Sequence, residues 1–228
     1  MFLTKAKLNK AELNKIIQEI SLKSPQPKKV TIIAVTKTFT YSAIKEAFDN
    51  KVYNIGENKI QELENKIKNK ILPEKLKIHF IGKLQSNKAK KAVLLCDYIQ
   101  TVDSLRLAQK INTHAKILSK KQKIYIQINI GNDNKKQGLV GENKEIYIKI
   151  SLLENVQVVG LMTILPKVDK KKTKELYLAM KKLQQKIKKE YFKECEEISM
   201  GMSGDYHLAL ESGATNIRIG TKLYGKRT

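Results

Sequence analysis

Residues 30–58 read VTIIAVTKTFTYSAIKEAFDNKVYNIGEN. Two β-branched, apolar runs, 30–37 and 52–58, flank a segment in which apolar residues recur at helical spacing. Neither run alternates polar with apolar residues, which is typical of a parallel strand that is covered on both faces. The stretch therefore predicts a strand–helix–strand unit of an α/β protein.

The same strand-then-helix pattern continues to the end of the chain. Eight strand candidates alternate with helical segments, at 30–37, 52–58, 77–82, 98–102, 123–130, 156–164, 196–202 and 215–221. Asp103 is the expected cap of the helix after the fourth strand, and a long helix is expected over 169–190. Eight such units predict a single TIM-type (β/α)8 barrel. An open doubly wound sheet is the alternative, but it normally has fewer strands, and no GxGxxG follows the first strand here.

An amphipathic helix is expected ahead of the barrel, over residues 1–24. Its apolar residues fall near one face, namely Leu3, Leu8, Leu13, Ile16, Ile17 and Ile20. Pro25 and Pro27 then end the helix. Because no repeat or low-complexity linker interrupts the chain, we expect one domain over 1–228, with the barrel at 30–228.

Composition narrows the class of protein. The 228 residues are 41% hydrophobic, and the formal net charge is +23. Such a charge can indicate nucleic-acid binding, yet only three of the 45 basic residues are arginine, and the lysines lie mainly on expected helix faces. We therefore interpret the charge as a solvated lysine surface and expect no specific nucleic-acid partner; a basic nucleic-acid-binding protein is kept as an alternative.

The sequence also bears on the cellular compartment. No apolar run reaches the roughly 18–20 residues that a bilayer requires, and the N-terminus has no signal-peptide pattern, so we expect a cytoplasmic protein without a membrane partner. Cys96 and Cys195 stand alone, which favours two reduced thiols over a disulfide or a metal site.

Lys37 closes the first strand candidate. In a (β/α)8 barrel the functional groups gather at the C-terminal ends of the strands. A lysine directly behind an apolar strand is expected to be partly desolvated, which lowers the pKa of its amine, and a neutral amine attacks aldehydes. In a lysine-rich chain, an ordinary surface lysine is the alternative.

The last two strand ends carry anion-binding chemistry. The turn MGMSGD presents Ser203, and the turn RIGT presents Arg218, Gly220 and Thr221. Hydroxyls, exposed amides and a helix N-terminus suit a phosphate, and this fold commonly binds phosphate with these two loops. Two ordinary glycine turns are the alternative. Together with Lys37, the pattern suits a phosphorylated aldehyde.

Two further polar residues end the second and third strand candidates, Asn58 and His79. A lone histidine in a strand is more often a hydrogen-bonded core residue than a catalyst. Zinc-ligand spacing, a GxSxG elbow, a P-loop and paired carboxylates at strand ends are all missing from the sequence, so we expect no metal centre and no hydrolase of those types.

Several stretches from about residue 30 to the end carry a recognisable pattern: AVTKTF, NIGENKIQEL, IHFIGKLQSNK, TVDSLRLA, IQINI with Gly138 later, GLMTI and SMGMSGDYHLALESGATNIRIGTKLYGKR. In these stretches, which occur in the family's order, the chain resembles the YggS/PROSC family of pyridoxal phosphate homeostasis proteins. The resemblance implies a barrel like the N-terminal domain of alanine racemase, the fold type III barrel that binds pyridoxal 5′-phosphate (PLP).

The resemblance also implies roles for particular residues. Lys37 would form the Schiff base with PLP; Ser203, Gly220 and Thr221 would hold the phosphate; Arg218 would face the pyridine nitrogen; and Asn58 and His79 would lie near the ring. No residue is assigned a catalytic role, and turnover of a substrate is not expected.

The function implied is cofactor homeostasis: buffering PLP, delivering it to PLP-dependent apoenzymes, and influencing amino-acid and keto-acid balance. A monomer or weak dimer is expected. The alternative is a PLP-dependent amino-acid racemase of low activity, which needs a second proton carrier; Tyr41, Tyr206 and Tyr224 are the candidates. Because the chain stops at Thr228, we expect no C-terminal β-domain. Lys83 and the loop 131–138 depart from the family pattern.

Overall fold

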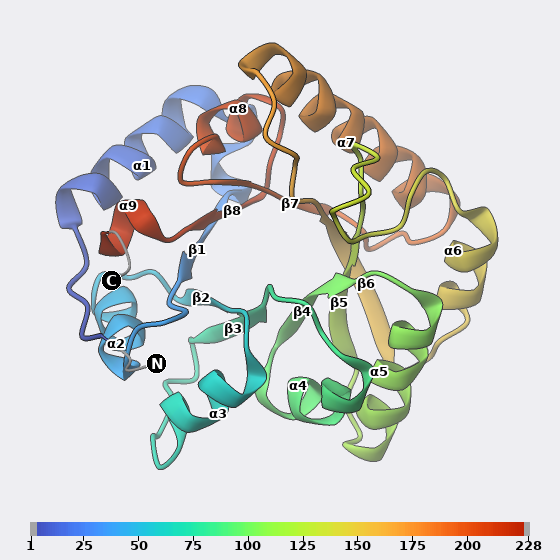
Figure 1. Cartoon of the computed structure of the whole chain (residues 1–228), viewed down its shortest axis with the longest axis horizontal. Helices are drawn as coiled ribbons and strands as arrows, with labels where there is room; N and C mark the ends of the chain where they lie inside the picture. Colours follow the sequence, from blue (N-terminus) through green and yellow to red (C-terminus); the bar gives the residue numbers. More distant parts are fainter. Residues whose placement is uncertain (1–3, 226–228) are drawn as a thin grey trace.

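A computed structural model describes residues 4–225 of the chain. Its eight parallel strands form a closed barrel in which every strand pairs with its neighbours in chain order. The helices surround the barrel (Figure 1). The predicted TIM-type (β/α)8 fold is confirmed.

The strands lie within a few residues of their predicted bounds. They are β1 (Thr31–Val35), β2 (Asn54–Glu57), β3 (Lys77–Phe80), β4 (Tyr98–Val102), β5 (Gln122–Gln127), β6 (Val156–Met162), β7 (Glu197–Met202) and β8 (Asn216–Ile219). The α-helices are α1 (Lys10–Lys23), α2 (Tyr41–Asp49), α3 (Ile60–Ile67), α4 (Ala89–Leu95), α5 (Leu105–Ile117), α6 (Lys144–Ser151), α7 (Lys170–Glu190), α8 (Tyr206–Glu211) and α9 (Thr221–Tyr224). Two 3-10 turns lie at Pro27–Lys29 and Ser86–Lys88.

The apolar strands are buried on both faces, as their sequences predict. Every residue of β8 is buried, and so are the last three residues of β1, β2 and β3. One face of each strand fills the barrel interior and the other packs under the helices. This double burial is why the strands carry continuous β-branched and apolar runs.

The N-terminal helix begins later than expected. Residues 1–24 were expected to be helical, whereas α1 starts at Lys10, because Asn9 accepts the N–H of Glu12 (3.1 Å) and caps the helix there. Before the cap, Thr4 pairs with Phe39 in an isolated bridge. Leu3 lies outside the described residues. Helix α1 packs against α8 and α9, so it closes the helical ring near the end of the chain (Figure 1).

The cap of α5 also differs from the expectation. Ser104, not Asp103, accepts the N–H of Leu107 (3.3 Å). Both residues are favourable caps, and the backbone places the second one at the position that reaches the free amides. Cys96 and Cys195 are buried free thiols, as expected. No helix within residues 4–225 is long and apolar enough to cross a membrane.

Candidate functional site

The loops that follow β8, β1 and β2 stand side by side at one mouth of the barrel. Strand β1 lies between β8 and β2, with Ala34 opposite Ile219 and Val35 opposite Gly56. Lys37 follows β1 by two residues and is half-buried. The barrel therefore brings Lys37, Asn58 and the Gly220–Thr221 turn, which are far apart in the sequence, to one rim.

The loop after β7 is joined to the loop after β8 through one hydroxyl. Ser203 Oγ accepts the N–H of Gly220 (3.3 Å) and, at the limit of hydrogen bonding, the N–H of Lys222 (3.5 Å). Thr221 lies between these two residues and is exposed. Two amide donors and a hydroxyl thus converge on one point beside β1, which is the arrangement that phosphate oxygens require.

Asp205 fixes the turn that carries Ser203. Its carboxylate accepts the N–H of Met202 (2.7 Å) and the phenol O–H of Tyr177 from α7 (2.8 Å). Burial, with Asp205 adding to it, raises the pKa of Tyr177, so the phenol stays protonated and keeps donating. Sequence reasoning missed Asp205, although an acidic residue within the MSGD turn is a recognised turn signal.

Arg218 lies inside the barrel, only 3% exposed. Its guanidinium donates to Ser199 Oγ (2.7 Å) and to the carbonyl of Thr163 (2.8 Å). Burial lowers the pKa of Arg218 from its ordinary value, but an arginine starts so high that it remains a cation. A fixed positive charge therefore stands inside the barrel on β8, two residues before Gly220.

A chain of hydrogen bonds runs from Arg218 across the interior to His79. Ser199 Oγ donates to Gln100 Oε1 (2.7 Å), Gln100 Nε2 bonds to His79 Nδ1 (2.9 Å), and His79 Nε2 bonds to Asn54 Oδ1 (2.9 Å). Because the Gln100 amide nitrogen can only donate, Nδ1 accepts and Nε2 carries the imidazole hydrogen. The imidazole also stacks on Tyr98, with ring centroids 4.3 Å apart. His79 is therefore a neutral part of a buried polar layer.

The neutrality of His79 predicts acid sensitivity. Burial lowers the pKa of His79 to about 3 in the folded protein, against about 6.5 in the unfolded chain. The stability that neutral His79 contributes is complete above pH 6.5 and is lost as the pH falls towards 3. Between pH 7 and pH 4.5 the wild type is expected to lose about 2.5 kcal/mol through this group.

Denaturant unfolding at the two pH values checks this, with His79→Gln as the reference. That variant keeps polar atoms in the layer but has no imidazole to protonate, so it lacks this part of the pH dependence. Equal losses of unfolding free energy in wild type and variant would show that His79 is not the group responsible.

Next to Lys37 lies a buried ion pair that sequence reasoning also missed. Lys66 Nζ on α3 is 2.5 Å from Glu57 Oε1 at the end of β2, and both side chains are fully buried. Burial raises the pKa of Glu57, and the nearby Lys66 ammonium opposes that shift. The four-residue spacing of Glu62 and Lys66 was visible in the sequence, but the burial of Lys66 was not.

Asn58 carries an unpartnered acceptor. Its side-chain oxygen Oδ1 is buried and has no hydrogen-bond partner among residues 4–225. A Cβ added to Gly82, after β3, would lie 2.1 Å from the Asn58 carbonyl oxygen, so the β2 and β3 loops touch through backbone. Asn58 and Lys83 border a pocket of about 330 Å³ at this mouth. A buried oxygen without a partner is a place where a ligand donor fits.

The tyrosines that a racemase could use as a second proton carrier have structural contacts. Tyr224 is buried and donates its phenol to the carbonyl of Ala43 (2.9 Å), and burial raises its pKa. Burial also raises the pKa of Tyr206, with Glu19 adding to the shift. Both phenols are therefore poor acids. Tyr41 is half-buried, and Lys70 Nζ lies 5.6 Å from its ring centroid.

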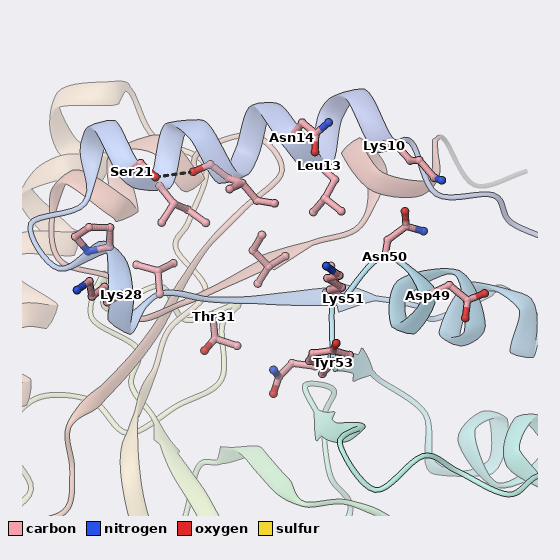
Figure 2. A pocket seen from close by; sticks show the side chains of 17 residues that line it. Lys10, Leu13, Asn14, Ser21, Lys28, Thr31, Asp49, Asn50, Lys51 and Tyr53 are labelled. Atoms are coloured by element: carbon pink, nitrogen blue, oxygen red, sulfur yellow. Dashed lines mark hydrogen bonds between the residues drawn. The ribbon is translucent and has the colours of Figure 1, made fainter.

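A cavity of about 930 Å³ lies elsewhere, on the outer wall of the barrel. Figure 2 shows side chains of α1, such as Leu13 and Asn14, on one side and Lys51 and Tyr53 near the start of β2 on the other. None of the predicted site residues borders this cavity. Within the described part of the chain, no cluster of three or more His, Cys, Asp or Glu could hold a metal ion.

The sequence matches the family described as alanine racemase, N-terminal domain, over residues 9–228. A relative from Synechocystis sp., named pyridoxal phosphate homeostasis protein, is 38% identical over 203 residues, which cover 88% of this chain and 93% of that protein. The Escherichia coli K12 protein of the same name is 34% identical and covers 88% of this chain and 87% of its own length.

Solved structures agree with these relationships. PipY of Synechococcus elongatus PCC7942 without PLP superposes with a TM-score of 0.83 at 34% identity, covering 92% of this chain and all of PipY. The PipY structure with PLP bound has a TM-score of 0.78. Alanine racemase of Clostridium difficile 630 has a TM-score of 0.73 at 21% identity; the match covers all of this chain and 60% of the racemase, and it shows the shared fold alone.

Proposed function

Because this chain belongs to the family of pyridoxal phosphate homeostasis proteins, we propose that it holds PLP on Lys37 and takes part in the homeostasis of that cofactor. PLP, when bound, supplies an aldehyde that condenses with a primary amine and releases water. The observation that carries the proposal is the convergence of a half-buried lysine after β1 with the joined loops after β7 and β8. PLP is bound in the related PipY structure.

The phosphate is assigned to the turn residues. Ser203 offers a hydroxyl, Gly220 offers an amide that already points at this hydroxyl, and Thr221 offers an exposed side chain beside it. Phosphate oxygens in this position would accept the hydrogen bonds that the backbone N–H groups now donate to Ser203 Oγ. The Asp205 carboxylate accepts the N–H of Met202 and so fixes the turn that carries Ser203. The groups that would donate to the phosphate therefore do not have to be ordered on binding.

The ring is assigned to the residues between the phosphate loops and Lys37. Arg218 would place its cation against the pyridine nitrogen and so keep that nitrogen unprotonated, because a neighbouring positive charge disfavours protonation. Asn58 has a buried acceptor free for a ring substituent. His79 would support the ring from the polar layer to which Arg218 belongs. An unprotonated ring withdraws electrons weakly, which suits a carrier of the cofactor better than a catalyst.

The cellular role that we propose is buffering PLP and delivering it to PLP-dependent apoenzymes, with an influence on amino-acid and keto-acid balance. Half-burial of Lys37 supports exchange with solvent. The net charge of +23 opposes self-association and supports a monomer or weak dimer. Two buried free thiols fit a reducing compartment such as the cytoplasm.

Borohydride reduction followed by peptide mass spectrometry tests the proposal. Purified protein incubated with an equimolar amount of PLP is reduced, digested and searched for the phosphopyridoxyl mass. We expect one dominant modified peptide, containing Lys37, because Lys37 follows β1, which pairs directly with β8, and is half-buried beside the joined loops. Modification spread over the many surface lysines, without preference for Lys37, would reject the proposal.

A further inference from the structure

The peptide groups on both sides of Lys37 are held by one network of side chains, buried at Lys66 and Glu57 and part-buried at Glu62. On the N-terminal side, the carbonyl of Thr36 accepts a hydrogen bond from Lys66 Nζ (2.9 Å). On the C-terminal side, the N–H of Thr38 donates to Glu62 Oε1. Lys66 Nζ also lies 3.2 Å from the same Glu62 oxygen, so the two sides are linked to each other.

Glu57 completes the network beneath the loop. Its Oε1 accepts the hydroxyl of Thr36 (2.6 Å) and the ammonium of Lys66 (2.5 Å). Its other oxygen, Oε2, is buried and has no partner within the described residues. A buried ion pair is weak evidence for stability, because desolvation offsets much of the attraction, and a buried carboxylate oxygen left unpaired adds to that cost. Such a network is better explained by what it holds in place than by net stabilisation.

What it holds is a strained turn. Thr38 has a φ of +71°, in the left-handed region that a β-branched residue rarely adopts. A backbone in such a conformation persists only where its surroundings determine it, and these positions gather at functional sites. Thr38, the strained residue, directly follows Lys37. The hydrogen bond from its N–H to Glu62 holds its backbone in this conformation.

We propose that Glu62 and Lys66 are positioning residues for Lys37: through Thr36 and Thr38 they hold the lysine backbone so that its amine meets the aldehyde of PLP seated in the phosphate loops. The inference rests on the proposed function. Both residues act on the lysine through its neighbouring peptide groups. Loss of the clamp leaves the phosphate and ring contacts intact and impairs only the encounter between the amine and the aldehyde.

Two ligands separate this role from general loss of structure. PLP uses the loops and the amine, whereas pyridoxine 5′-phosphate has an alcohol in place of the aldehyde and uses the loops only. For Glu62→Ala we expect the dissociation constant of PLP to rise about 10-fold, equivalent to about 1.4 kcal/mol, and that of pyridoxine 5′-phosphate to change less than about 2-fold. Borohydride trapping at Lys37 should fall in parallel.

Two further variants complete the comparison. Glu62→Gln keeps an acceptor for the Thr38 N–H and should restore PLP affinity to within about 3-fold of wild type. The control is Glu64→Ala, on the same helix, which removes a carboxylate that pairs with Lys91 at the surface. This variant should bind both ligands as the wild type does. If Glu62→Ala does not fold, Glu57→Gln/Lys66→Met, which removes the buried charges together, should show the same selective loss.

The outcomes distinguish the two proposals. Wild-type protein that is not trapped at Lys37 rejects the proposed function itself. Wild-type protein that is trapped, together with a Glu62→Ala variant that binds PLP as Glu64→Ala does, rejects the positioning role alone. An equal loss of affinity for both ligands also rejects it, because a purely structural defect would weaken the phosphate loops as well.

Discussion

Replacing Lys37 by alanine is expected to abolish covalent PLP binding and to raise the dissociation constant at least about 100-fold, or about 2.7 kcal/mol. The amine after β1 is the only nucleophile that we assign to the aldehyde, and the loops after β7 and β8 supply only hydrogen bonds and charge. Absorbance titration with PLP, followed by borohydride, measures both the affinity and the covalent fraction.

Lys83→Ala is the matched control for that experiment. Lys83 borders the pocket beside Asn58 at the same mouth but is exposed. It should retain wild-type affinity and a wild-type yield of trapped cofactor. A Lys37→Ala protein that still gave one equivalent of borohydride-stable cofactor would contradict the assignment of Lys37 as the PLP-binding lysine. Loss of trapping in Lys83→Ala would assign that role to Lys83 instead.

The second large effect concerns stability. Lys66→Met leaves the buried Glu57 carboxylate without its cation, and breaking a buried pair by removing one partner destabilises a protein by about 3–5 kcal/mol. Because small proteins are stabilised by about 5–15 kcal/mol in total, the variant should unfold at clearly lower denaturant concentration. Equilibrium unfolding followed by circular dichroism measures the difference.

The double variant Glu57→Gln/Lys66→Met separates burial of charge from packing. Since it removes both charges of the pair, it should recover at least half of the stability that Lys66→Met loses. If the positioning role is correct, it regains stability without regaining PLP affinity, because no ammonium holds the Thr36 carbonyl. A Lys66→Met variant as stable as the wild type would show that the Glu57–Lys66 pair does not contribute to the free energy of unfolding.

Much of the site could be predicted from where residues stand relative to strand ends. Lys37, Asn58, Ser203 and Gly220 each follow an apolar run, and a closed parallel barrel brings all strand ends of one polarity to one mouth. That inference needs no knowledge of side-chain contacts. The roles of these residues towards PLP stay predictions that the experiments above test.

The contacts behind the site could not be predicted in the same way. Glu62 and Lys66 look like an exposed helical pair in the sequence, and Asp205 looks like an ordinary turn residue. Their importance arises because α3 packs with this face towards the barrel and α7 brings Tyr177 against the β7 turn. Hydrogen bonds between residues distant in the chain depend on packing geometry, which local patterns do not encode.

The alternation of strands and helices can be predicted from the sequence alone, because hydrophobic periodicity is a local property that burial on both faces imposes on each strand. Other features emerge only when the barrel folds: α1 begins at Lys10, His79 is a neutral member of a polar layer that reaches Arg218, and a buried ion pair holds the Lys37 turn. These features depend on burial and charge pairing between segments, so a side chain acquires its environment only when the barrel closes.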